Sequence, residues 1–202
     1  MTKDYVNVFL VSCFITLSIT SHVIAFKVVE IRGVDIIPSS ATYMMCFVIL
    51  DLISIINKKK IIYLLITIEA MANICMITVT TIVAYAPSPD YVLVSESYKD
   101  VFTPIIIMYV ANTVGSLVAF ILDYKLFSSL YYKFGFLISS LISSIVIILA
   151  YTTITDIMAF KFVYPEHYLN LTTVNVITNI IFLSVVTTIV TPFVGKLRRI
   201  TL

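Results

Sequence analysis

Six long apolar stretches, separated by short polar breaks, constrain what this chain can fold into more than any other feature. A helix needs about 20 residues to cross the ~30 Å hydrocarbon core of a bilayer, and the chain reaches about that length repeatedly. The second stretch is the shortest, and Asp51 interrupts it. The six lie at about residues 5–26, 41–57, 61–85, 105–124, 136–160 and 172–194.

The composition also favours a membrane protein. Hydrophobic residues make up 60% of the 202 residues and charged residues 12%, which is about half the charge of a typical soluble domain. Spanning segments must be helices or strands of a closed barrel, because their backbone polar groups need partners away from water. Barrel strands alternate apolar and polar residues, and Ile138–Ala150 does not. We predict an all-α integral membrane protein, with residues 1–202 forming a single six-transmembrane-helix bundle.

Several other classes of protein are disfavoured. The first stretch is expected to be a span and not a cleaved signal peptide, because it is long and no small-residue cleavage site precedes Lys27. Six spans leave no room for a soluble catalytic domain, and no nucleophile–base pair or phosphate-binding glycine loop is evident, so we expect no enzyme. Cys13, Cys46 and Cys75 lack metal-ligand spacing, so we expect neither a metal nor another cofactor. The basic residues form no patch for nucleic acid.

The Lys and Arg residues predict the orientation. Nine of the 13 fall at the N-terminus, at the C-terminus or in connections on the same side as the termini, and four fall on the other side. Cytoplasmic connections carry the excess of Lys and Arg, so we predict that both termini are cytoplasmic. The nine are Lys3, Lys58, Lys59, Lys60, Lys125, Lys133, Lys196, Arg198 and Arg199.

Two carboxylates within the spans are the main functional candidates. Asp51 and Glu69 lie about 9 Å and about 12 Å from the cytoplasmic ends of neighbouring spans, with no Lys or Arg at that depth. Ionisable groups inside a bilayer are costly and usually face a cavity or a partner. A neutral carboxyl bonded to a neighbouring helix is the alternative for Glu69, and a cytoplasmic anchor for Asp51. Asp123 and Asp156 are expected near the membrane faces, where carboxylates cost little.

Four further polar residues are candidates for substrate binding. Asn73 lies one turn after Glu69 on the same helical face. His22 is a candidate ligand near the outer end of the first span, or an interfacial residue. Asn112 and Ser143 lie on polar stripes of the fourth and fifth spans. Helix packing and side-chain bonds to the helix backbone are the alternatives for these stripes.

An ordered set of short motifs runs along the chain. The segment Ile19–Val29, ITSHVIAFKVV, is followed by Tyr43 and Asp51 in the second span and by the basic loop Lys58–Lys60. The later motifs are Leu122–Asp123, Phe127, Leu130, Ser143–Ser144, Thr191–Pro192 and the basic residues Lys196, Arg198 and Arg199. The set resembles the queuosine precursor transporter family, also called the VUT family, over nearly the whole chain.

The chain also departs from the family pattern. His22 stands where the family usually has Asn. Ile55, Phe120 and Tyr151 stand at positions where the family has an acidic residue, an amide and an Asp, and Lys58 replaces a glycine. The resemblance therefore informs the fold more than the substrate.

The resemblance implies a transporter in the bacterial inner membrane that imports queuosine precursors, the 7-deazaguanines preQ0 and preQ1. A carboxylate can accept two hydrogen bonds from the donor edge of such a ring, and Glu69 with Asn73 would suit that edge. Two alternatives stay open: a substrate-binding subunit of an energy-coupled vitamin-type importer, and a non-transporting membrane scaffold. The expected partners are the small-molecule solute, the lipid bilayer, and either a second copy or a coupling chain.

Overall fold

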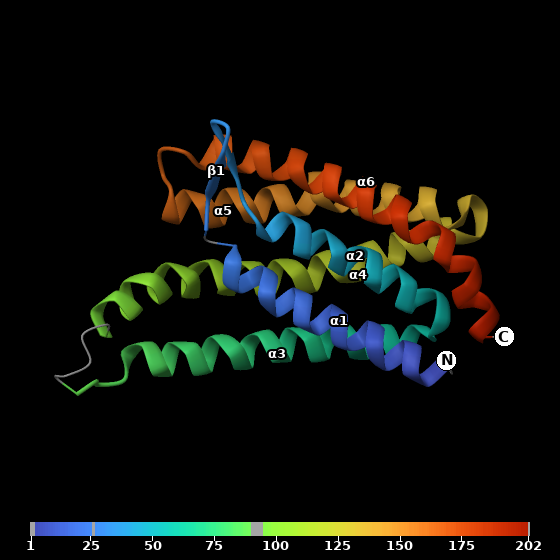
Figure 1. The fold of residues 1–202 in the computed structure, drawn as a ribbon, viewed down its shortest axis with the longest axis horizontal. Helices are drawn as coiled ribbons and strands as arrows, with labels where there is room; N and C mark the ends of the chain where they lie inside the picture. The colour runs from blue at the N-terminus through green and yellow to red at the C-terminus, as the bar shows by residue number, and fades with distance from the viewer. Residues whose placement is uncertain (1–2, 26, 90–94, 202) are drawn as a thin grey trace.

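The computed structural model describes residues 3–25, 27–89 and 95–201. Nearly all of them are helical, in an elongated bundle with a small β-hairpin at one end (Figure 1). The elements are α1 (Lys3–Ile24), β1 (Val29–Ile31), β2 (Val34–Ile36), α2 (Ser39–Ile56), α3 (Lys59–Tyr85), α4 (Ser95–Ile147), the π-helix η1 (Ile148–Thr152), α5 (Thr153–Val163) and α6 (Tyr168–Thr201).

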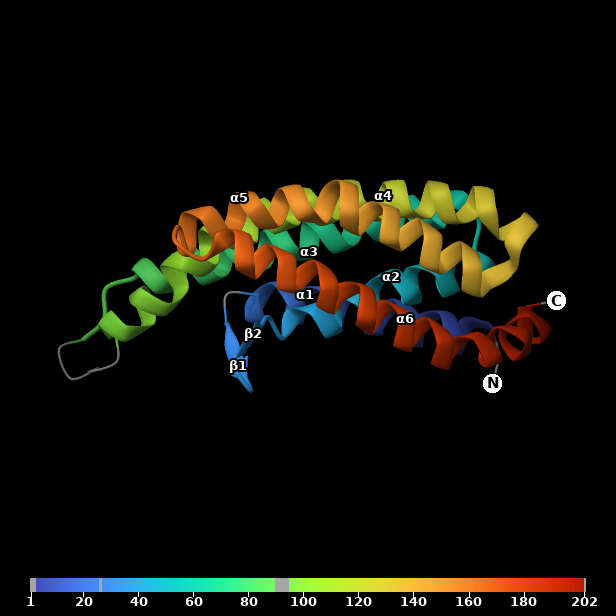
Figure 2. The same cartoon turned by 90° about the horizontal axis from the view of Figure 1, so that it is seen from above.

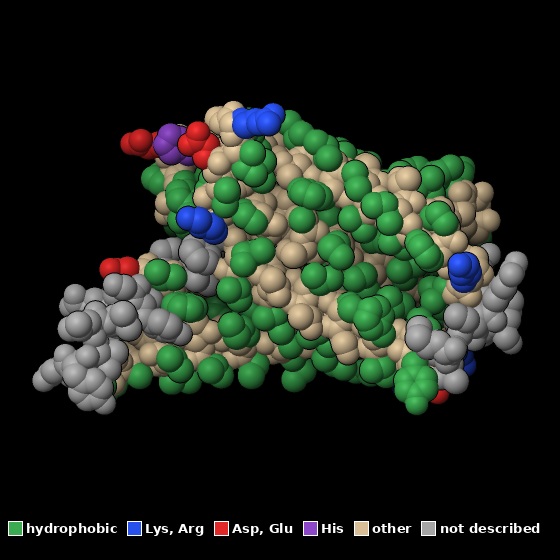
Figure 3. All heavy atoms as spheres, viewed as in Figure 1, with side chains coloured by type: hydrophobic (Ala, Val, Ile, Leu, Met, Phe, Trp, Pro, Cys, Tyr) green, Lys and Arg blue, Asp and Glu red, His purple; other side chains and the backbone are tan. Residues whose placement is uncertain are grey.

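Among the described residues, five helices are long and apolar enough to cross a membrane. Large apolar side chains such as Val79 and Ile82 of α3 point outward. Figure 3 shows hydrophobic side chains over the length of the bundle, with charged side chains at its two ends. The predicted all-α membrane class is confirmed. The five helices are Lys3–Ile24, Ser39–Ile56, Lys59–Tyr85, Asn112–Ala150 and Tyr168–Leu197.

The longest helix, α4, is divided at Gly135. This residue has φ 74° and ψ −177°, outside the helical region, and the chain reverses there (Figures 1 and 2). The first arm covers 95–134, and the second arm, 136–147, continues through η1 into α5. The sequence predicts a polar break over about 125–135, whereas the helix continues to the glycine. A single residue with positive φ is enough to turn the chain.

The segment after α1 forms a hairpin. Val29 pairs with Ile36 and Ile31 with Val34 in the antiparallel sheet. The two loop residues, Arg32 and Gly33, have φ of 53° and 80°, as a type I′ turn requires at both central positions. The sequence predicts only turns or short interfacial pieces here, so the paired strands are a difference that the structure adds.

The connections divide between the two ends of the bundle. Both termini, the α2–α3 connection and the reversal at Gly135 lie at one end, which we call the terminal end (Figure 1). The hairpin and the α5–α6 connection lie at the other, which we call the hairpin end. Three fully buried rings, Phe14, Phe47 and Phe120, occupy the core between α1, α2 and α4.

Alanine substitutions at Gly135 and Gly195 allow the effect of backbone strain to be measured without steric crowding. A Cβ at either position would meet nothing within 4 Å, and only Gly135 has positive φ. Gly135→Ala should therefore destabilise the fold by about 1–3 kcal/mol through strain. Gly195→Ala, inside α6, should stabilise it by about 0.5–1 kcal/mol. Thermal unfolding of the purified protein in detergent measures both, and equal effects would contradict the positive-φ turn.

Candidate functional site

A narrow pocket lies among five helices near the hairpin end. Most of its lining is polar, although the surrounding helices are apolar. A soluble ligand would find hydrogen-bonding groups here that the lipid-facing surface does not offer. The polar lining residues are Ser21 and His22 of α1, Ser39, Ser40 and Tyr43 of α2, Asn112 and Ser116 of α4, Thr155 and Asp156 of α5, and Asn175 and Asn179 of α6.

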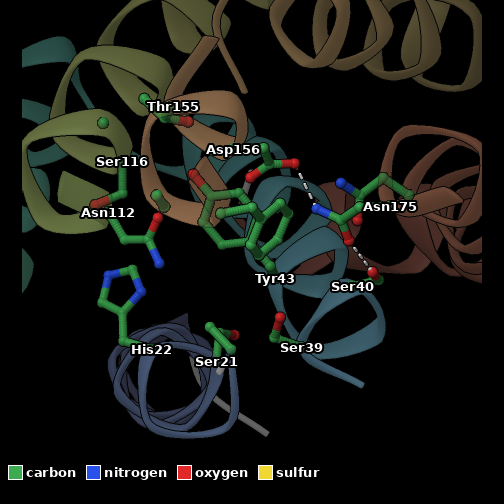
Figure 4. Close-up of a pocket in the computed structure, with 15 residues that line it drawn as sticks. Ser21, His22, Ser39, Ser40, Tyr43, Asn112, Ser116, Thr155, Asp156 and Asn175 are labelled. Carbon is green, nitrogen blue, oxygen red and sulfur yellow. Dashed lines mark hydrogen bonds between the residues drawn. The ribbon is translucent and has the colours of Figure 1, made fainter. Parts of the chain in front are cut away.

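Three side chains on three helices form a hydrogen-bonded chain along one wall. Ser40 Oγ donates to Asn175 Oδ1, and Asn175 Nδ2 donates to Asp156 Oδ2, each over 2.5 Å. Figure 4 shows this chain with Tyr43 beside it. All three side chains are buried. The amide thereby holds the carboxyl group of Asp156 in one orientation at the pocket.

The π-helix η1 precedes this wall. A π-helical turn holds an extra residue and shifts the helical phase of the residues after it. Thr153 Oγ1 bonds to the carbonyl oxygen of Ile148, five residues back, over 3.0 Å. The shifted turn sets the phase in which Asp156 reaches the pocket.

The opposite wall contains His22 and Asn112. The His22 ring is buried, and its Nε2 atom has no hydrogen-bond partner among the described residues. The Asn112 carboxamide lies beside it (Figure 4). The ring of Tyr109 packs against His22 with the centroids 5.0 Å apart and the planes at 71°. An unpartnered ring nitrogen in a polar pocket is available to a ligand.

Glu69 lies behind this wall in a second polar cluster. Ser18 Oγ and Asn73 Nδ2 both donate to Glu69 Oε1. Tyr109 donates to Asn73 Oδ1 over 3.0 Å. The other carboxyl oxygen, Glu69 Oε2, has no partner among the described residues. Glu69 does not line the pocket, but a path through Asn73 and Tyr109 connects it to His22.

Asp51 lies in a third cluster, deeper toward the terminal end. It interacts electrostatically with Asp123 of α4, and the side chain of Ser140 faces it. Ser144 Oγ donates to Asp123 Oδ1 over 3.0 Å. Ser143 Oγ bonds to the carbonyl oxygen of Ser140 over 3.3 Å. All five side chains are fully buried.

Aromatic rings separate the pocket from this third cluster. Tyr43, at the pocket, packs on Phe47 and Phe120 with centroids 5.2 and 5.8 Å away. Phe120 also packs on Phe14 and Phe47, each at 5.1 Å. We call Phe14, Phe47 and Phe120 the aromatic barrier.

The structure thus distributes the predicted site residues over three places. His22 and Asn112 line the pocket, Glu69 and Asn73 form the cluster behind it, and Asp51 with Ser143 belongs to the deeper cluster. The sequence predicts that Asp51 and Glu69 lie at a similar depth, and that either both face one cavity or Glu69 bonds to a neighbouring helix. Glu69 does bond to a neighbouring helix, through Ser18 of α1. The two carboxyl groups belong to different clusters, because Asp51 faces Asp123 on α4.

Sequence reasoning missed Asp156 as a pocket residue. The fifth span is predicted to end near residue 160, which puts Asp156 near a membrane face. The helix continues to Val163, so Asp156 lies about 10 Å from its end. Asn175 lies at the same distance from the start of α6, and this match in depth was readable from the sequence.

The described part of the chain contains no group of three or more His, Cys, Asp or Glu side chains placed to hold a metal ion. Cys13, Cys46 and Cys75 are free thiols.

Comparison with known proteins gives one match. A family described as "Putative vitamin uptake transporter" matches residues 39–196, which is more than three quarters of the chain. Neither curated proteins nor solved structures gave a match. The matched region contains all of the pocket except its α1 wall.

Removing the Tyr109 hydroxyl tests the cluster behind the pocket. Tyr109→Phe leaves the buried Asn73 Oδ1 without its donor, which should cost about 1 kcal/mol of stability. Tyr85→Phe is the matched control, because the hydroxyl of Tyr85 meets Thr103 in an exposed contact and its loss should cost less than about 0.5 kcal/mol. Denaturant unfolding in micelles measures both. Equal losses would contradict the buried bond.

Proposed function

The chain belongs to the family described as putative vitamin uptake transporters, and we propose that it imports a small, planar, purine-like solute. The solute class that the sequence resemblance favours is the queuosine precursors, the 7-deazaguanines preQ0 and preQ1. The observation that carries the proposal is the polar pocket, where Asp156, Asn175 and Ser40 form one wall and Tyr43 lies beside them.

The proposed topology has six membrane passes with both termini in the cytoplasm of a bacterium. The two arms of α4, which reverse at Gly135, supply the fourth pass and the start of the fifth. Both termini lie at one end of the bundle, and nine of the 13 Lys and Arg residues belong to segments at that end. Under the positive-inside rule, this excess supports a cytoplasmic terminal end. The pocket near the hairpin end would face the exterior.

In this proposal Asp156 recognises the solute. A guanine-like edge presents adjacent N–H donors, and a carboxylate accepts such a pair in a bidentate manner. The amides of Asn112 and Asn175 offer further donors and acceptors, and the Tyr43 ring offers a face for stacking. An aminomethyl group on the ring would add a positive charge that Asp156 favours.

Glu69 and Asn73 take a positioning role. Both lie behind the pocket wall, and Asn73 accepts the hydroxyl proton of Tyr109. Tyr109 in turn packs against His22. The cluster would fix the His22 ring, which leaves Nε2 directed to the solute.

The pocket also favours a ligand-binding protein over a membrane scaffold. Polar side chains that only join helices are satisfied by one another, and such bonds contribute about 0.6 kcal/mol on average. The His22 Nε2 atom has no such partner among the described residues. A buried polar atom without a partner costs stability, which a ligand can offset.

Binding by purified protein tests the assignment of Asp156. In detergent, preQ1 should raise the melting temperature, because a ligand that binds only the folded state stabilises it. Asp156→Asn should raise the dissociation constant for preQ1 by about 10–100-fold, as expected for lost charge-assisted hydrogen bonds. Asp100→Asn, an exposed position away from the pocket, is the matched control and should bind normally.

Four outcomes decide between the candidates. No stabilisation by preQ0, preQ1 or guanine in the folded wild type would overturn the purine-like substrate. Strong loss of binding in Glu69→Gln with normal binding in Asp156→Asn would move recognition to the cluster behind the pocket. Uptake by vesicles that contain this chain alone would support a complete transporter. Binding without uptake, restored by a copurifying ATPase, would support a subunit of an energy-coupled importer.

A further inference from the structure

The proposed binding of solute in the pocket does not account for the deeper cluster on α2 and α4. Asp51 and Asp123 are 0% exposed, and the two carboxyl groups interact across the helices. Ser140 faces Asp51, but neither oxygen of Asp51 makes a hydrogen bond of standard geometry among the described residues, and Asp123 Oδ2 makes none either. The buried hydroxyl of Ser140 makes no such bond either. Four oxygen atoms on three helical segments are therefore available.

Two neighbouring carboxylates cannot both keep a negative charge away from water. Burial and mutual repulsion both disfavour the doubly charged state. One positive charge between them removes the repulsion. The available atoms are oxygens, which are the ligands that hard cations prefer, and a carboxylate pair can equally share one proton.

We propose that the Asp51–Asp123 pair binds one exchangeable monovalent cation, H⁺ or Na⁺, that drives solute import. This inference rests on the proposed transport function. The cation and the solute would move in the same direction, one cation with each solute, and the free energy of the cation gradient would drive accumulation.

The position of the pair suits coupling. Asp51 follows Tyr43, the pocket residue nearest to it along α2, by eight residues, which is about 12 Å, so the cation would bind apart from the solute. Phe47 lies one turn before Asp51 on α2, and Phe120 lies one turn before Asp123 on α4. The two rings pack on each other at 5.1 Å.

The same two helices therefore carry the pair and the aromatic barrier. A bound cation draws α2 and α4 together at Asp51 and Asp123 and keeps Phe47 packed on Phe120. When the cation leaves, repulsion between the carboxylates separates the helices and loosens the barrier toward the terminal end. Movement of a bundle around a fixed midplane site is how many transporters alternate access.

Among the described residues, few charged groups surround the pair. Asp51 and Asp123 interact with each other, and Tyr43 of α2 interacts with Asp123. On α3, the ring of Tyr63 packs on Tyr124, the residue after Asp123, with the centroids 5.6 Å apart. A dependence of stability on Na⁺ or pH that is lost when either Asp is changed therefore reports on the pair.

The first experiment needs no solute. The melting temperature of detergent-purified protein is measured against NaCl at constant ionic strength, with choline chloride as the balancing salt, and separately against pH. A bound cation stabilises the folded state by mass action. If the cation is Na⁺, the melting temperature rises with Na⁺. If it is H⁺, the melting temperature falls as the pH is raised and Na⁺ has no effect.

Asp51→Asn and Asp123→Asn should each abolish that dependence. The melting temperature of each variant is compared with that of the wild type under the same conditions. The contributions of Glu69 and Asp156 then cancel, because both residues are present in all three proteins. Asp4→Asn, an exposed carboxyl at the start of α1, should retain it. If the wild type and both Asn variants show the same dependence of the melting temperature on Na⁺ and on pH, the cation site is overturned, whatever the solute.

The second experiment measures preQ1 uptake into vesicles that contain the chain alone, with an imposed Na⁺ gradient at equal pH or an imposed pH gradient at equal Na⁺. Wild type should accumulate solute under one of the two gradients. The Asn variants should bind preQ1 with a dissociation constant within about twofold of that of wild type, because the pair is distant from the pocket. They should fail to accumulate preQ1.

Gradient-driven accumulation that survives in both Asn variants would overturn the coupling. Accumulation that responds to neither gradient in wild type would overturn it as well. A cation effect on stability without any purine binding would leave the pair intact and refute the proposed substrate.

Discussion

The absence of water in the bilayer core is the constraint on which the rest of this structure depends. Each backbone group must find a partner within its own helix, so the chain is helical through its apolar length. The hydroxyls of many Ser and Thr residues follow the same requirement. Thr78 and Thr81 of α3, for example, bond to the carbonyl oxygens four residues before them. Polar side chains that do not turn back onto their own helix are therefore informative. Among the described residues, many of them belong to the clusters around Glu69, Asp156 and Asp51.

The three clusters differ in how far the protein satisfies them. Glu69 receives two hydrogen bonds on one oxygen, and Asn73 is bonded through both ends of its amide. The pocket wall of Asp156, Asn175 and Ser40 is ordered in the same way but borders open space. Asp51 has no partner on either oxygen among the described residues. Glu69 Oε2 also has no partner among the described residues. We propose a positioning role for the Glu69 cluster, solute recognition for the pocket wall and cation binding for the Asp51 cluster.

In the proposed mechanism the aromatic barrier connects the pocket with the Asp51 cluster. Tyr43 contacts the pocket on one side and the buried rings Phe47 and Phe120 on the other. Phe120 replaces an amide of the family pattern that the sequence resembles, so this chain has an apolar contact where a polar group is usual. Packed rings have discrete arrangements, so in the proposed mechanism a small shift of α2 against α4 would open or close a path for the solute.

Composition and apolar length alone determined the membrane class, because hydrocarbon accepts only backbone that is bonded internally. They also indicated where helices lie, apart from the continuation of α4 to Gly135 and the short hairpin. They could identify polar residues that are expensive in lipid, among them Glu69, Asp51 and His22. Only the tertiary structure decided which of these meet. Depth along a helix is readable from the sequence, but the direction of a side chain depends on which helices are neighbours and on local phase, as the π-helix before Asp156 shows. Asp51 therefore faces Asp123 and not Glu69, and Asp156, which depth alone placed near a membrane face, lines the pocket.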